Sequence, residues 1–242
     1  MRYLATIEYV GTNYAGWQIQ PNGVSIEEEI EKVLSRILNR KTKIYGSGRT
    51  DAGVHAHGQT FHFDAFQIKD LGKFLYSLNS LLPSDMHVLD IRQVRDDFNA
   101  RYDAKSKTYS YYINMGEYDP FERDKMYQFL RKLDVEKMME ALDAFKGTHN
   151  FQNFTSKPED MNNYVRTIHE ASIEQVGDIL KITFTGNGFM RYMVRMMVGA
   201  LIEVGLGKLT EMQIKILLVD INRKVVSYKA PANGLYLEKV TY

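Results

Sequence analysis

The chain has no cysteine. Disulfides and thiolate metal sites are therefore excluded, and the composition suits a reducing cytoplasm, where we expect the protein to act. The sequence also lacks any apolar run approaching the roughly 20 residues that span a bilayer, so we expect no membrane partner. Its first residues, MRYLATIEYVG, are too few and too polar for a signal peptide and are typical of a first strand.

The sequence also has no large excess of positive or negative residues. The chain has 31 Lys and Arg against 30 Asp and Glu, which gives a formal net charge of +1. A nucleic-acid partner would therefore have to bind local basic patches. In other respects the composition is that of an ordinary globular protein, and 242 residues suffice for one domain or two small ones with a sizeable core.

The hydrophobic pattern predicts the element order β-α-β-β-α-β twice. The expected elements of the first half are the strands RYLATIEYVG, KTKIYGS, GQTFHFDAF and MHVLDIRQV, with helices opened by Ser25 and Asp70. Those of the second half are the strands KTYSYYINM, VRTIHEASIEQV, DILKITFTG and GLYLEKVTY, with helices at Asp134–Phe145, FMRYMVRMMVGALIEVG and TEMQIKILLVD. We therefore expect an α+β fold in which two ferredoxin-like halves, residues 1–100 and 101–242, form a large, mostly antiparallel sheet flanked by helices.

Between two strands of the first half lies GSGRTDAGVHA, from Gly46 to Ala56, with three glycines, an arginine and an aspartate. Glycines spaced this closely indicate a tight turn or a backbone that approaches another group. A P-loop and a dinucleotide fingerprint are disfavoured, because no Lys-Ser/Thr pair follows the last glycine and a strand comes next. From the residues alone, Asp51 could equally form an Asx-turn with nearby backbone.

Three histidines lie in or after this segment: His55, His57 and His62. They could be considered as metal ligands, but no acidic or cysteine ligands stand at a suitable spacing. Histidines along one strand and its approach are the favoured interpretation.

Two further segments combine charge with apolar residues. Methionines surround Arg195 in FMRYMVRMMVGALIEVG, which predicts that Arg195 points inward and needs a carboxylate, whereas Arg191 could reach water or a ligand phosphate. The alternative for both is a solvated stripe on a surface helix. In the second segment, Lys105 and Lys107 precede and enter a strand that carries Tyr109, a mixture of basic and aromatic residues typical of nucleic-acid binding. Ordinary core tyrosines are the alternative there.

Taken together, these segments resemble the tRNA pseudouridine synthase A (TruA) family. GRTDAGVHA, uninterrupted from Gly48 to Ala56, is that family's signature. Further matches, in family order along the chain, are YVGTNYAGWQIQ, DDFNARYDAKSKTYSYY, RTI, FMRYMVRMMVG and GLYLEKV. The resemblance implies the pseudouridine synthase fold. It also implies an isomerase, free of metal and organic cofactors, that converts uridine to pseudouridine at positions 38, 39 and 40 of the tRNA anticodon stem-loop.

The resemblance also implies residue roles. Asp51 would be the catalytic aspartate, Tyr109 would lie against the target base, Arg195 would pair with the aspartate, and Arg49 would help to hold the flipped nucleotide. A homodimer would share a basic cleft around the anticodon arm of one tRNA. Candidate contacts with the substrate are Arg191, Lys105, Lys107, Arg36, Arg40, Lys41, Lys43 and Arg101.

Two other functions stay open at this point. A noncatalytic RNA-binding protein built of two ferredoxin-like units would bind RNA without turnover, although the aromatic pattern of RRM central strands is missing. A hydrolase that cleaves nucleoside glycosidic bonds with Asp51 would release free uracil, and it would normally need a second carboxylate near the site.

Overall fold

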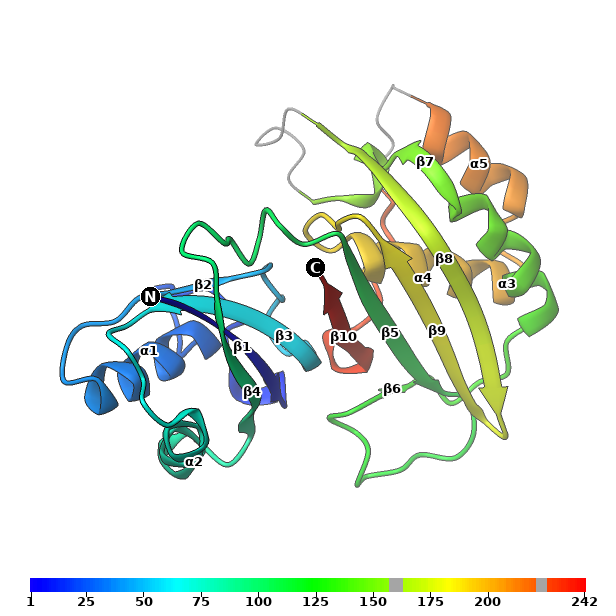
Figure 1. The fold of residues 1–242 in the computed structure, drawn as a ribbon. Helices are drawn as coiled ribbons and strands as arrows, with labels where there is room; N and C mark the ends of the chain where they lie inside the picture. Colours follow the sequence, from blue (N-terminus) through cyan, green and yellow to red (C-terminus); the bar gives the residue numbers. More distant parts are fainter. Residues whose placement is uncertain (157–162, 221–225) are drawn as a thin grey trace. The chain divides into compact units, whose positions relative to one another are not determined.

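The structure is a computed structural model that describes residues 1–156, 163–220 and 226–242. The described chain forms two compact units, one of Met1–Lys105 together with Tyr236–Tyr242 and one of Ser106–Leu235 (Figure 1). Within these residues, no helix has the length and apolar character to cross a bilayer.

The first unit is an antiparallel sheet with two helices. Its elements are β1 (Arg2–Tyr9), α1 (Ile26–Ile37), β2 (Ile44–Gly46), β3 (His55–Asp64), α2 (Leu71–Leu81), β4 (Met86–Val94) and β10 (Leu235–Thr241). Strand β1 pairs antiparallel with both β3 and β4, and β2 pairs antiparallel with β3. The resulting order β4-β1-β3-β2 follows from a β-α-β-β-α-β chain of the ferredoxin-like type, as predicted. Strand β10 adds to β3 in parallel.

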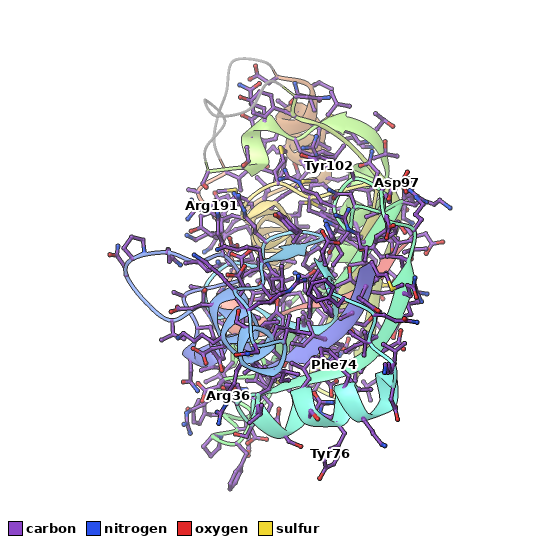
Figure 2. All side chains as sticks on the ribbon, turned by 60° about the vertical axis from the view of Figure 1, so that its left-hand side comes forward. Arg36, Phe74, Tyr76, Asp97, Tyr102 and Arg191 are labelled. Carbon is purple, nitrogen blue, oxygen red and sulfur yellow. The ribbon has the colours of Figure 1, made fainter. Side chains whose placement is uncertain are left out.

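Both helices of this unit begin at the residues that the sequence indicated. The Ser25 hydroxyl accepts the Glu28 N–H at the start of α1, and the Asp70 carboxylate accepts the Lys73 N–H at the start of α2. Helix α2 is amphipathic: Phe74 packs into the unit against Phe63, whereas Tyr76 is 76% exposed (Figure 2).

The second unit is also built on an antiparallel sheet, but the strand GLYLEKVTY, which was expected to close this half, forms β10 and clusters with the first unit from Tyr236 onward. The elements of the second unit are β5 (Ser106–Asn114), β6 (Tyr127–Gln128), α3 (Val135–Leu142), β7 (Gly147–Asn150), β8 (Val165–Val176), β9 (Ile179–Gly186), α4 (Met193–Gly205) and α5 (Glu211–Val219). Antiparallel pairing gives the order β5-β9-β8-β7, and β6 adds to β5 in parallel. The two short strands β6 and β7 were not expected from the sequence.

Helix α4 begins later than predicted. The apolar pattern predicts a helix from Phe189, but the helix starts at Met193, because Tyr192 has a left-handed backbone with φ 63°. Arg191 therefore lies before the helix and not one turn below Arg195 on it. The predicted α+β class, with a mostly antiparallel sheet and flanking helices, is nevertheless confirmed. The division into domains at residues 100 and 101 stays a prediction.

His62 on β3 is a buried histidine with a structural task in the first unit. Its Nδ1 accepts the Ala100 N–H at 3.1 Å, and its ring stacks on Tyr45 at 5.0 Å between centroids. The side chain thereby joins β3 to the segment in which Phe98 and Ala100 pack against Leu4. Protonation of Nδ1 would remove the acceptor.

Acidification is expected to destabilise this unit through His62. Burial, with a smaller contribution from Arg2, lowers the pKa of His62 below that of an exposed histidine. The stability gained by keeping the ring neutral is present above the unfolded-state pKa of about 6.5 and is lost as the pH falls through the folded-state pKa. In His62→Asn, the side-chain oxygen can still accept the Ala100 N–H. When the pH is lowered from neutral, the urea concentration at the unfolding midpoint should therefore fall by less in this variant than in the wild type.

The exposed histidine of the same strand provides the control. His57→Asn should leave the pH dependence of the midpoint as it is in the wild type. Equal pH dependence in all three proteins would mean that His62 is not held neutral.

Candidate functional site

The glycine-rich segment forms the loop between β2 and β3, with Asp51 half-buried and Arg49 exposed on it. The Asp51 carbonyl accepts the Val54 N–H at 3.1 Å, which closes a four-residue turn. Gly53, the third residue of the turn, has φ +78°, a conformation that favours glycine. One of the glycines of the segment is thus required by the turn that begins at Asp51.

A buried polar network on the β3 side holds the first half of the loop. The Gln59 side chain, fully buried, accepts the Ser47 hydroxyl at 2.7 Å and donates to the Gly48 carbonyl at 3.0 Å. The same Gln59 oxygen accepts the Thr60 N–H at 3.1 Å. Next to Asp51, the Thr50 hydroxyl shares a hydrogen bond of 2.8 Å with the Tyr9 hydroxyl.

Burial raises the pKa of the Tyr9 phenol far above its ordinary value, against the smaller opposite effects of hydrogen bonds with Thr50 and Gln59. Tyr9 is therefore neutral at all physiological pH values. Its phenol serves this loop as a hydrogen-bonding group and not as a charge.

The segment from Gly11 to Trp17 covers the loop from another side. The Gly11 N–H donates to His55 Nδ1 at 3.1 Å, and a Cβ at Gly11 would collide with the Val54 carbonyl. Gly16 has φ +101°, and a Cβ there would lie 2.7 Å from the Thr50 carbonyl oxygen. The Trp17 N–H donates to that same Thr50 oxygen at 3.0 Å. Sequence reasoning from the residues missed this role, although two glycines five residues apart were a usable signal.

The histidines of β3 have structural partners. His55 and His62 each accept a backbone N–H at Nδ1, and the exposed His57 stacks on Tyr236 at 5.0 Å between ring centroids. In the part of the chain that the structure describes, no group of three His, Asp or Glu side chains is arranged to hold a metal ion. The three side chains thus contact backbone or aromatic groups along this strand.

Tyr109 lies on β5 in the second unit and is 8% exposed, with its ring edge against Phe189 at 5.1 Å. Lys107 enters the same strand and is half-buried. Lys105, exposed, is the last residue of the first unit before the chain crosses into β5. A fully buried neighbour, Tyr111, donates to the Pro231 carbonyl at 2.8 Å and is the core tyrosine of this strand.

Arg195 on α4 is buried, at 9% exposure, as the surrounding methionines predicted. Its Nε donates to the Ala230 carbonyl at 2.7 Å, and its guanidinium lies 5.2 Å from the centroid of the Tyr192 ring. The alternative of a solvated stripe is therefore wrong for Arg195. Arg191 is exposed and donates to the Tyr192 hydroxyl at 3.1 Å (Figure 2).

Three cations surround the Tyr192 ring. Besides Arg195, the Arg191 guanidinium lies 4.9 Å and the Lys229 ammonium 4.3 Å from its centroid. Each contact is of the cation–π type. Three positive side chains around one aromatic ring make the local electrostatic potential positive, which favours the binding of an anion such as a phosphate. Lys229 had no signal in the sequence, because it lies far from the motif that contains Tyr192.

The predicted site residues therefore belong to both units. Asp51, Arg49 and Lys105 are in the first unit. Tyr109, Lys107, Arg191 and Arg195 are in the second. Within the first unit, the structure surrounds the Asp51 turn with Tyr9, Gln59 and the segment Gly11–Trp17, all of which sequence reasoning from the residues left without a role.

The comparisons with known proteins point to one family over most of the chain. A family model described as tRNA pseudouridine synthase matches residues 5–103 and 141–242. The chain is similar to the tRNA pseudouridine synthase A of Exiguobacterium sp., with 43% identity over 98% of this chain and 96% of the relative. It is also similar to that of Streptococcus mutans, with 41% identity over 100% and 99%. A chain of a Cbf5-Nop10-Gar1 complex aligns with 97% of this chain and 48% of its own at a TM-score of 0.39 and 11% identity, which is too low to support an argument.

Gly16→Ala tests how tightly the loop is covered. The substitution should lower the free energy of unfolding by about 1–3 kcal/mol, because alanine is strained in this left-handed conformation and its Cβ would press on the Thr50 carbonyl. Gly72→Ala on α2 is the control, since a Cβ there meets Asp70 at 3.4 Å and alanine favours a helix. Urea unfolding should show a loss for the first variant and none for the second. Equal midpoints would contradict the tight covering.

Proposed function

Because the chain belongs to the tRNA pseudouridine synthase family, we propose that it isomerises uridine to pseudouridine in the anticodon stem-loop of tRNA, at positions 38, 39 and 40. The bond between C1′ and N1 of uracil breaks, the base turns over, and a bond between C1′ and C5 forms. N1 gains a proton and C5 loses one, so the reaction is an isomerisation without oxidant or reductant. It therefore requires no redox cofactor.

The observation that carries this proposal is the uninterrupted GRTDAGVHA segment, with its half-buried Asp51, on a loop held by backbone and side-chain hydrogen bonds. An ionised carboxylate can act as a nucleophile at C1′ or as a base in an elimination. Either role requires that the carboxylate meet the sugar at one fixed position, and the fixed loop suits that requirement.

Asp51 is the catalytic residue of the proposed mechanism. Tyr109 supplies an aromatic face for the detached uracil, where stacking on a base contributes roughly 1–3 kcal/mol. From the family resemblance, we propose Arg195 as the cation that keeps the Asp51 carboxylate ionised. Arg49 helps to hold the target nucleotide after it has left its stack, as base-modifying enzymes require.

The RNA backbone is proposed to contact the basic residues. Arg191, exposed beside the Tyr192 ring together with Lys229, is suited to a phosphate because guanidinium and ammonium groups donate to its oxygens. Lys105, just before β5, and Lys107, within that strand, are further candidates. Because the net charge is only +1, binding depends on these local groups. Two copies of the chain are proposed to share one tRNA in the cytoplasm.

Asp51→Asn tests the catalytic assignment. Forming the C1′–C5 bond displaces the C5 hydrogen, so tRNA with 5-tritiated uridine releases tritium into water only when the isomerisation proceeds. The wild type should release label, and Asp51→Asn should release none, because the amide cannot act as nucleophile or base. Binding of tRNA, measured by filter retention, should remain.

The other outcomes separate the competing functions. If the wild type binds tRNA and releases no label, the protein is a noncatalytic RNA binder. If label appears in free uracil, the protein is a glycosidic hydrolase. Turnover by Asp51→Asn would refute the role of Asp51 in either reaction.

Arg195→Gln tests the proposed pairing with Asp51. A carboxylate without its cation is protonated more readily, so the acidic limb of the kcat/KM profile should move to higher pH. Arg191→Gln is the matched control on the same segment. It should weaken tRNA binding, reduce the salt dependence of that binding, and leave the pH profile in place. An unchanged profile in Arg195→Gln would contradict the pairing.

A further inference from the structure

The fully buried Gln59 is the polar side chain that joins strand β3 to the loop of Asp51. The next residue of the strand is Thr60, and its carbonyl accepts the Ser47 N–H at 2.8 Å. The two consecutive β3 residues therefore hold the start of the loop through both backbone and side chain. No substrate atom is required for these contacts.

The hydrogen-bonding capacity of Gln59 matches the loop group by group. Its oxygen accepts the Ser47 hydroxyl and the Thr60 N–H, and its NH₂ group donates to the Gly48 carbonyl. A leucine or methionine of similar size would leave that carbonyl and that hydroxyl without these partners in a buried place. The chemistry of a neutral amide is therefore needed here, because a donor and an acceptor must be supplied side by side.

The Gly48 carbonyl, which Gln59 holds by a hydrogen bond, lies three residues before Asp51 in the loop. Thr50 is fixed at its carbonyl by Trp17 and at its hydroxyl by Tyr9, so the chain on each side of Arg49 is held. We propose that Gln59 is a positioning residue for the reaction, which sets the place of the Asp51 carboxylate through Gly48 and Ser47. The inference rests on the proposed function, and wild-type turnover tests that function separately.

A misplacement of about 1 Å in a reacting group can cost about 100-fold in rate. Loss of the Gly48 contact should therefore act on kcat. Binding of tRNA should change little, because the Gln59 side chain is fully buried. This separates a positioning residue from a binding residue, for which KM or the dissociation constant would change.

Gln59→Glu is the first variant. The carboxylate keeps both acceptor contacts, but when ionised it faces the Gly48 carbonyl with no hydrogen to donate. We expect kcat for tritium release to fall by about 10- to 100-fold near pH 8, with the dissociation constant for tRNA within about twofold of the wild type. A buried carboxyl group takes up a proton more readily than an exposed one, and the protonated form is again a donor. The ratio of variant to wild-type kcat should therefore rise as the pH is lowered.

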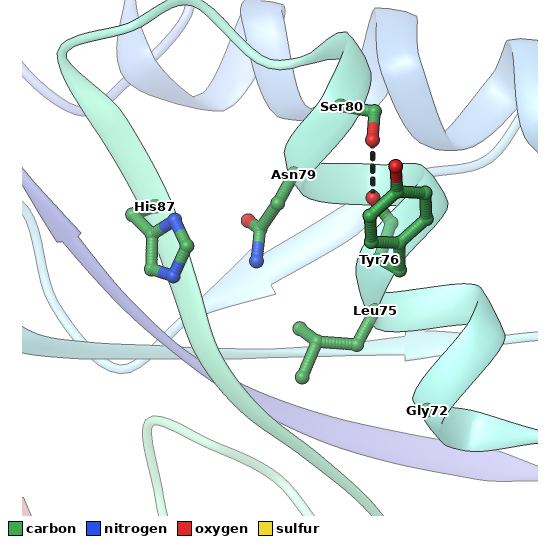
Figure 3. Close-up of a pocket in the computed structure, with 6 residues that line it drawn as sticks. All are labelled: Gly72, Leu75, Tyr76, Asn79, Ser80 and His87. Carbon is green, nitrogen blue, oxygen red and sulfur yellow. Dashed lines mark hydrogen bonds between the residues drawn. The ribbon is translucent and has the colours of Figure 1, made fainter.

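Asn79→Asp is the matched control. Asn79 on α2 also holds a strand by its amide, donating to the Val88 carbonyl at 2.9 Å and accepting the Val88 N–H at 2.8 Å. It lies in the open pocket between α2 and β4, away from the loop, with Leu75, Tyr76 and His87 (Figure 3). The substitution makes the same chemical change, an amide facing a carbonyl becoming a carboxylate. It should lower the thermal midpoint and leave kcat and its pH dependence unchanged.

Ser47→Ala keeps the test decisive if Gln59→Glu folds poorly. It removes one hydroxyl from the network and leaves the Gly48 contact, so a kcat loss of several-fold is expected at unchanged tRNA affinity. The proposal is overturned if Gln59→Glu or, failing its folding, Ser47→Ala turns over like the wild type. It is also overturned if Asn79→Asp loses kcat to the same extent, or if the loss in Gln59→Glu lies wholly in tRNA binding.

Discussion

The buried part of the loop backbone must find hydrogen-bond partners, and this constraint governs the structure around Asp51. A loop between two strands leaves carbonyls and N–H groups that no ladder satisfies. Here they are met by Gln59, by Trp17 and by the turn at Gly53. The segment Gly11–Trp17, which packs closely on the loop through its two glycines, and the polar residues Gln59 and Thr60 of β3 supply these partners.

The residues proposed for the reaction are divided between the two units of the chain. The strand that follows the loop, β3, belongs to the first unit, and β5 with Tyr109 and α4 with Arg195 belong to the second. The chain passes between the units twice, after Lys105 and after Leu235. The candidate polar residues of the two units are held by different kinds of contact. In the first unit, the Gln59 side-chain amide holds the loop of Asp51. In the second, Arg195 contacts a backbone carbonyl and an aromatic ring.

Local signals predicted most of the fold. Ser25 and Asp70 indicated two helix starts, and the alternation in GQTFHFDAF indicated β3. The β7 strand escaped prediction because GTHN is short and polar, and the start of α4 was wrong because nothing in an apolar run reveals a left-handed tyrosine. For the site, the sequence pointed to Asp51 and to a buried Arg195. It could not reveal Gln59, because one glutamine in a strand has no periodic signature and its partners are set by tertiary packing.

The position of β10 has a consequence for how the protein is made. The strand that pairs with β3 next to the loop, at Tyr236 and Leu237, follows the whole second unit in the sequence. During translation, most of the first unit leaves the ribosome early, but its last strand is made only after all of the second unit. A nascent or truncated chain thus carries the signature loop without its neighbouring strand. The first unit is therefore complete only after the second unit has been synthesised.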